Sequence, residues 1–152
     1  MNLYAEGSKF FHGSVTQNLK VLTPQMDPML KRKVVWASYY RPYAAIFTLP
    51  WKDTNFLGSR CDPDCQYWIA EVSKNNKAYI NKPCSIYIIE PVRTSWDKPK
   101  MGMKRAGNKI YNIGKEVPDA FTIGVCKVIK EFKYKNVLEC YMKNQVGVVF
   151  IQ

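Results

Sequence analysis

The sequence is poor in several residue types and patterns that mark common classes of protein. It contains a single histidine, which excludes the metal sites that need two or more imidazoles. It has neither a P-loop nor a G-x-G-x-x-G segment, so a P-loop kinase or a Rossmann-type dehydrogenase is not expected. No run approaches the roughly 18 apolar residues of a membrane span, and residues 1–10 lack the pattern of a signal peptide. The lack of a membrane span and of a signal peptide predicts a cytoplasmic protein without a membrane partner.

Acidic residues are also scarce. The chain has 12 Asp and Glu against 23 Lys and Arg, which gives a formal net charge of +11. Such an excess creates a field that attracts anions. We therefore expect an anionic partner such as a nucleic acid or a nucleotide, although charge alone does not identify which anion it is.

The cysteines do not form a recognisable framework. There are five, an odd number, and Cys61 and Cys65 are spaced C-x3-C with no second pair at a zinc-binding spacing. We expect reduced thiols and no metal site.

The pattern of elements predicts one α+β domain spanning residues 1–152. A chain of this length can bury a core without disulfide or metal staples. Expected strands cover residues 10–14, 33–38, 84–91, 121–132 and 146–151, and short helices are expected at 39–47 and 136–143. Expected loops cover residues 25–33, 54–64 and 92–114, while 66–72 and 78–80 fit either a helix or a strand. These elements show no regular βαβ alternation, which favours α+β over a doubly wound sheet.

Two groups of residues suggest chemistry. The only histidine, His12, stands in the segment FFHGS beside Gly13, and glycine lets a backbone approach a ligand closely. The long polar segment after residue 91 is rich in cations, which suit contacts with phosphate groups. The predicted phosphate or nucleic-acid contacts are Lys98, Lys100, Lys104, Arg105 and Lys109.

Three segments, taken in order, resemble the rifampin ADP-ribosyltransferases. FFHGS followed by NLKVLTP resembles the opening His-Gly-Thr/Ser motif of that family. VVWAS followed by two alanines resembles the second motif, and IYIIEP with the downstream GNKIYNIGKEVPDAFTIGVCKVI resembles the third. The similarity covers about residues 10–130. Each motif is weak alone, but their order and spacing are moderately specific.

The resemblance implies an ADP-ribosyltransferase-like split β-sheet with short helices and a cleft for NAD as substrate. In the family the histidine holds a ribose hydroxyl and the glycine backbone holds the nicotinamide amide, and these roles would fall on His12 and Gly13. An aromatic ring stacks on the nicotinamide. The ring at that position is Trp36, where the family usually has Tyr, and Tyr39 and Tyr40 are alternatives. The implied NAD-binding set is His12, Gly13, Ser14, Trp36, Tyr39 and Tyr40.

The family also has a catalytic acid in the region after Glu-Pro. Alignment on Pro99 places Lys98 at that position and Asp97 one residue earlier, so Asp97 is the predicted acid beside His12. The implied reaction is loss of nicotinamide through an oxocarbenium-like state and attack by an acceptor such as a nucleic acid or protein. Two alternatives remain open: a glycosidase that acts on modified nucleic acid in the same cleft, and a non-catalytic binder of nucleotides or nucleic acid.

Overall fold

The computed structural model of the chain describes residues 9–28, 30–49, 57–61, 68–97, 103–106, 109–112 and 119–150. Within these residues most regular structure is antiparallel sheet, and two short α-helices and one 3₁₀ helix accompany it. The structure therefore has the predicted mixed α+β class. No helix in the described ranges is long and apolar enough to cross a membrane.

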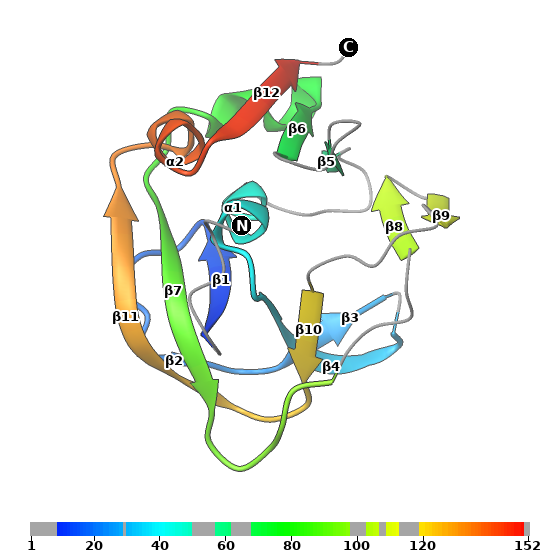
Figure 1. Ribbon diagram of the computed structural model, residues 1–152, viewed down its shortest axis with the longest axis vertical. Coiled ribbons are helices and arrows are strands. Elements are labelled where there is room, and N and C mark those ends of the chain that lie inside the picture. The colour runs from blue at the N-terminus through cyan, green and yellow to red at the C-terminus, as the bar shows by residue number, and fades with distance from the viewer. Residues whose placement is uncertain are drawn as a thin grey trace.

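The largest sheet has seven strands, and its first strand in the chain lies at its centre (Figure 1). Six strands follow the order β10-β4-β1-β7-β11-β2 with antiparallel neighbours, and β3 pairs with a further part of β4. The strands are β1 (Phe10–Ser14), β2 (Val21–Leu22), β3 (Gln25–Asp27), β4 (Arg32–Ser38), β7 (Cys84–Pro91), β10 (Asp119–Thr122) and β11 (Cys126–Tyr134). Segments far apart in the sequence thus meet on both sides of β1.

Two smaller sheets complete the strand arrangement. The three-stranded sheet has the order β12-β6-β5, with β12 parallel to β6 and β5 antiparallel to it. Its strands are β5 (Leu57–Cys61), β6 (Trp68–Val72) and β12 (Val146–Phe150). A separate antiparallel pair is formed by β8 (Met103–Ala106) and β9 (Lys109–Asn112).

The helix α1 (Arg41–Ile46) lies against β1. It has Pro42 in its first turn, where a missing N–H is tolerated. Its two alanines are buried, and their small side chains let the helix backbone come close to the sheet. The 3₁₀ helix η1 (Lys74–Tyr79) begins at Ser73, whose side chain accepts a hydrogen bond from the N–H of Asn76.

The helix α2 (Val137–Lys143) is capped at its first turn by its own sequence. The side chain of Asn136 accepts a hydrogen bond from the N–H of Glu139 at 2.7 Å. The Glu139 carboxylate in turn accepts one from the N–H of Lys135 at 2.7 Å. The first bond satisfies a donor that the helix start leaves unpaired, and the second ties the residue before the cap to the first turn.

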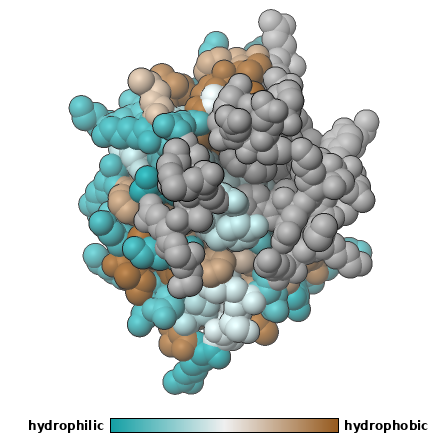
Figure 2. Space-filling view, viewed as in Figure 1, coloured by the Kyte–Doolittle hydropathy of each residue, from teal (hydrophilic) through white to brown (hydrophobic). Residues whose placement is uncertain are grey.

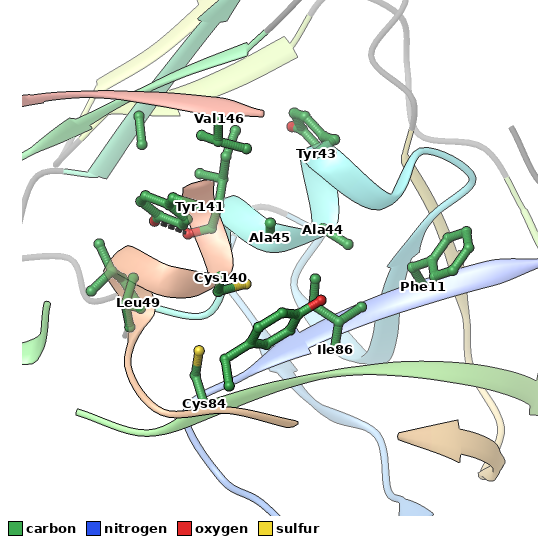
Figure 3. Close-up of a cluster of buried hydrophobic side chains, with 14 of the residues drawn as sticks. Phe11, Tyr43, Ala44, Ala45, Leu49, Cys84, Ile86, Cys140, Tyr141 and Val146 are labelled. Atoms are coloured by element: carbon green, nitrogen blue, oxygen red, sulfur yellow. Dashed lines mark hydrogen bonds between the residues drawn. The ribbon is translucent and has the colours of Figure 1, made fainter. Parts of the chain in front are cut away.

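The position of β7 between two core clusters explains why its sequence is a continuous apolar run. Ile86 and Ile88 belong to a large cluster that the sheet shares with both helices (Figure 3). Tyr87 and Ile89, on the alternate positions, belong to a second cluster with residues of β2, β4 and β11. Since β7 is buried on both faces, its pattern does not alternate.

Several expectations about local structure were wrong. The expected loops contain β3, β5 and the β8–β9 pair, and the strand expected at 121–132 is two strands with a turn between them. At that turn a Cβ on Gly124 would lie 2.4 Å from the Oγ1 of Thr94, so a larger residue there would displace the Thr94 side chain. The segment 66–72, which fitted either element, contains the strand β6, and residues 78–79 lie in η1.

Candidate active site

The large sheet separates beside His12. Strand β1 has five paired positions with β7 but only one, Phe11 with Ser38, with β4. Beyond that single pair, the His12 Nδ1 lies 2.7 Å from the main-chain oxygen of Trp36 on β4. The imidazole thus occupies a place where a strand ladder would otherwise continue, and the edge of β1 facing β4 departs from regular pairing.

This hydrogen bond fixes the chemistry of the imidazole. A carbonyl oxygen can only accept, so the proton must be on Nδ1 and the lone pair on Nε2. Burial lowers the pKa of His12, while the bond to Trp36 acts in the opposite direction and more weakly. The ring is therefore neutral at pH 7, and its Nε2 has the acceptor character that a hydroxyl donor requires.

Gly13 has a packing reason to be glycine. A Cβ built on it would lie 2.1 Å from the carbonyl oxygen of Ala44 and 3.1 Å from the carbonyl carbon of Phe47. Both atoms belong to the backbone in and just after α1, which cannot move away independently. The absence of a side chain at Gly13 thus lets α1 rest directly on β1 beside His12.

An acid that the sequence interpretation did not single out lies in this region. Asp119 begins β10 and is in register with Ser38, which is itself in register with Phe11 on β1. Neighbouring strands are about 4.8 Å apart, so the backbone of Asp119 is roughly 10 Å from that of Phe11. Three adjacent strands therefore place the carboxyl-bearing residue, the serine and the residue preceding His12 in one row.

The Asp119 carboxyl has an unusual environment. Desolvation raises its pKa to about 8, and a hydrogen bond from the hydroxyl of Tyr43, 3.1 Å from Oδ2, partly opposes that shift. Tyr43 comes from the buried face of α1. Asp119 is half-buried, and a carboxyl whose pKa is strongly raised by desolvation is a frequent feature of functional sites.

Asp97, the acid predicted from the resemblance, lies farther from His12. Its backbone pairs with Phe121 through two hydrogen bonds of 2.7 and 2.9 Å, which places it beyond β10 at the edge of the sheet. It is therefore three strand spacings from β1, whereas Asp119 is two. Asp97 is exposed. Its proposed part in catalysis stays a prediction. The backbone of Asp119 is one strand closer to β1 than that of Asp97, and its side chain is on the face of the sheet that carries α1. The side chain of His12, in register with Tyr87, is on the other face by alternation.

The predicted aromatic residues have distinct positions. The Trp36 ring meets Phe121 edge-on, with centroids 5.5 Å apart, and its Nε1 donates to the Oδ1 of Asp27 at 3.0 Å. Its direct link to His12 is through the main-chain oxygen. Tyr39 and Tyr40 lie between β4 and α1, with ring centroids 4.9 Å apart. Both are partly exposed and follow the strand that carries Ser38.

The other predicted site residues are described less completely. Ser14 is partly buried, and its Oγ accepts a hydrogen bond from the N–H of Thr16 at 3.0 Å. Lys98 and Lys100 lie outside the described residues. Lys104, Arg105 and Lys109 are on the β8–β9 pair, in register with Tyr111, Ile110 and Ala106.

The cysteines with described side chains belong to the interior. Cys84, Cys126 and Cys140 are buried free thiols, and Cys84 and Cys140 line the large core cluster (Figure 3). Burial raises the pKa of Cys126 to about 11, which disfavours the nucleophilic thiolate. The described part of the chain holds no group of three or more side chains arranged to bind a metal.

Comparisons of the chain with protein-family models, with curated proteins and with solved structures find no match.

Proposed function

We propose that this protein is an ADP-ribosyltransferase that uses NAD as its donor substrate. The observation that carries the proposal is the His12–Trp36 contact at the point where β1 and β4 separate. It supplies a neutral imidazole with Nε2 as acceptor, held beside an irregular strand edge. The resemblance of FFHGS to the family motif assigns such an imidazole to a ribose hydroxyl.

The row of residues across β1, β4 and β10 includes a carboxyl group of the kind that the reaction of NAD needs. In the reaction the bond between C1′ of the ribose and the nicotinamide nitrogen breaks, and nicotinamide leaves as a neutral molecule. Positive charge develops on the sugar, and a nearby carboxylate stabilises it, as in glycosidases. We assign that carboxylate to Asp119, because it stands in the row of the last β1–β4 pair, one strand closer to β1 than Asp97, and is partly shielded from water.

The raised pKa of Asp119 is compatible with this part. Without a ligand, the carboxyl is largely protonated at pH 7, since its pKa is about 8. The cationic nicotinamide ring of NAD would favour ionisation, because an opposite charge nearby lowers the pKa of an acid. Binding of the donor would thus generate the carboxylate that the transition state needs. The acceptor nucleophile then forms the new bond to C1′ and releases its proton.

The test is release of nicotinamide from NAD, measured for the protein alone and with added DNA, RNA or protein. We expect release that His12→Ala and Asp119→Asn each reduce by a hundredfold or more, on the scale of losing a principal catalytic group. Asp97→Asn is the matched control for loss of one carboxylate and should retain most of the activity. Circular dichroism of every variant separates loss of function from loss of fold.

Absence of nicotinamide release from the folded protein with every acceptor would overturn the proposal. The net charge of +11 favours one other candidate, a glycosidase that acts on modified nucleic acid with water as acceptor. That enzyme would release a modified base or sugar from modified DNA without consuming NAD, so the same protein samples distinguish the two activities.

A further inference from the structure

The strand β11 gives the large sheet a strongly basic edge. On one side it pairs along its length with β7, and on the other it pairs with β2 only through Cys126 and Lys127. From residue 129 onward no strand among the described residues covers that second side. Figures 1 and 2 show β11 at the left of the molecule, where the surface is mainly hydrophilic.

Lysines recur along this edge. The exposed lysines of β11 and of the segments directly beside or after it are Lys20, Lys127, Lys130, Lys133 and Lys135. The nine residues of β11 span roughly 30 Å, so the charges are spread along the edge rather than gathered at one point. Lys130, in register with Ile88, and Lys133, in register with Ser85, leave the strand on opposite faces of the sheet. Cations spread over this length fit a polyanion with regularly spaced charges.

The acids near this edge are engaged with neighbouring groups. Glu131 accepts hydrogen bonds from the Ser85 hydroxyl at 2.6 Å and from the N–H of Asn18 at 3.0 Å. Glu90 pairs with Lys127 at 3.6 Å. Glu139 accepts a hydrogen bond from the N–H of Lys135 at 2.7 Å and pairs with Lys143 at 3.0 Å. The five lysines therefore have three glutamates near them, and each of these acids is held by a hydrogen bond or an ion pair.

The ring of Phe132, on the same strand, lies near two cationic side chains. The Lys130 Nζ is 4.9 Å from the centroid of Phe132, and the Arg41 guanidinium carbon is 5.5 Å from it. Arg41 begins α1, next to Tyr40. Phe132 is in register with Ile86, which is in register with Gly13, so β11 is two strand spacings from the candidate site. The basic edge thus runs up to the segment that borders that site.

We propose that the edge formed by β11 binds the sugar–phosphate backbone of a nucleic acid, which serves as acceptor for the reaction. The acceptor role rests on the proposed function, whereas the binding itself does not. Lysines neutralise phosphates and release counterions, and they do so without reading the base sequence. The polymer would lie along β11, two strand spacings from the candidate site.

The experiment measures binding of the full chain to fluorescein-labelled DNA and RNA of about 20 nucleotides, single- and double-stranded, at several salt concentrations. The test variant combines Lys130→Gln, Lys133→Gln and Lys135→Gln. Its matched control combines Lys31→Gln, Lys33→Gln and Lys74→Gln, which removes the same charge from exposed sites on the β3–β4 hairpin and η1. Fluorescence anisotropy gives the dissociation constant and its salt dependence.

We expect the test variant to bind at least tenfold more weakly near 0.1 M salt. For single strands its slope of log affinity against log salt should be shallower by about 2, because three phosphate contacts are lost. The control should change affinity less than about threefold. Equal weakening of both variants, or no binding by the unmodified chain at low salt, would overturn the proposal. If the triple variant melts early, Lys130→Gln and Lys135→Gln are tested singly, each with a slope change of about 0.7.

Nicotinamide release separates this proposal from the previous one. Release without nucleic acid should be equal in the unmodified chain and both variants, since none of the six lysines belongs to the candidate site. Stimulation by nucleic acid should be lost only in the β11 variant. Binding on β11 without any nicotinamide release would overturn the enzyme and leave the binding surface, whereas release without binding would do the reverse.

Discussion

The hydroxyl of Tyr43 in α1 donates a hydrogen bond to the carboxyl of Asp119 in β10, although 76 positions separate the two residues in the sequence. The contact joins the helix that packs on β1 to a strand at the far side of β4. It also opposes the effect of burial on the acid. The pair therefore couples the ionisation of Asp119 to the position of α1.

Tyr43→Phe should raise the pKa of Asp119 above its value of about 8, because the variant loses the hydrogen bond that favours the carboxylate. Carboxyl ¹³C NMR, with the resonance assigned by Asp119→Asn, measures the titration directly. The rising limb of nicotinamide release against pH should move to higher pH by the same amount. Tyr39→Phe is the control, and an equal or lower pKa in Tyr43→Phe would contradict the assignment.

The free energy of unfolding should depend on pH through the carboxyl of Asp119. Its folded-state pKa of about 8 exceeds the value of about 3.9 in an unfolded chain. The folded state therefore keeps a proton that the unfolded state releases, and this contribution is fully present below about pH 4. It is lost as pH rises toward 8, by at most about 1.4 kcal/mol per pH unit.

Urea denaturation at several pH values checks this expectation. The free energy of unfolding of Asp119→Asn should decline less between pH 4 and 8 than that of the unmodified protein. Parallel curves for the two proteins would show that the carboxyl is ionised in the folded state throughout that range.

His12 should titrate below its ordinary pKa with the proton of its neutral form on Nδ1. It is the only histidine, so its ¹⁵N and ¹H signals need no assignment by mutation. A long-range ¹H–¹⁵N NMR spectrum at pH 7 distinguishes the two tautomers. A neutral ring protonated on Nε2 would rule out the acceptor role that we give to that atom.

Gly13→Ala should destabilise the protein by about 1–3 kcal/mol, since the new Cβ meets backbone atoms rather than a side chain that can turn away. Val15→Ala, at an exposed neighbouring position, should change the free energy of unfolding by less than about 0.5 kcal/mol. Both are measured by urea denaturation. Wild-type stability in Gly13→Ala would mean that α1 does not rest on β1 as closely as described.

The sequence predicted those elements whose pattern is local. The run Ile86–Ile89 predicted β7 with its observed bounds, and Asn136 marked the start of α2. The turn at Gly124 was missed because apolar residues on both sides continue the pattern of one strand. An isolated glycine within such a pattern was the available signal for a break.

The candidate site was predictable only in part. His12 and Gly13 stood out because of their residue types, but the bond of His12 to Trp36 depends on how β1 and β4 pair. Asp119 was overlooked because the strand was expected to begin at residue 121. Its environment depends on Tyr43, a tertiary contact that no local pattern encodes. The acid at the start of an apolar segment was the only sequence signal.

The parallel pairing of β12 with β6 has a consequence for synthesis. Residues 146–150 complete the small sheet by joining 68–72, and Val146 also enters the large core cluster. As the chain leaves the ribosome, β12 emerges much later than β6. The edge of β6 that pairs with β12 therefore stays unpaired until residues 146–150 have been synthesised. Because long-range strand pairing is slow to form, this sheet should be the last part to become protected from amide hydrogen exchange during folding.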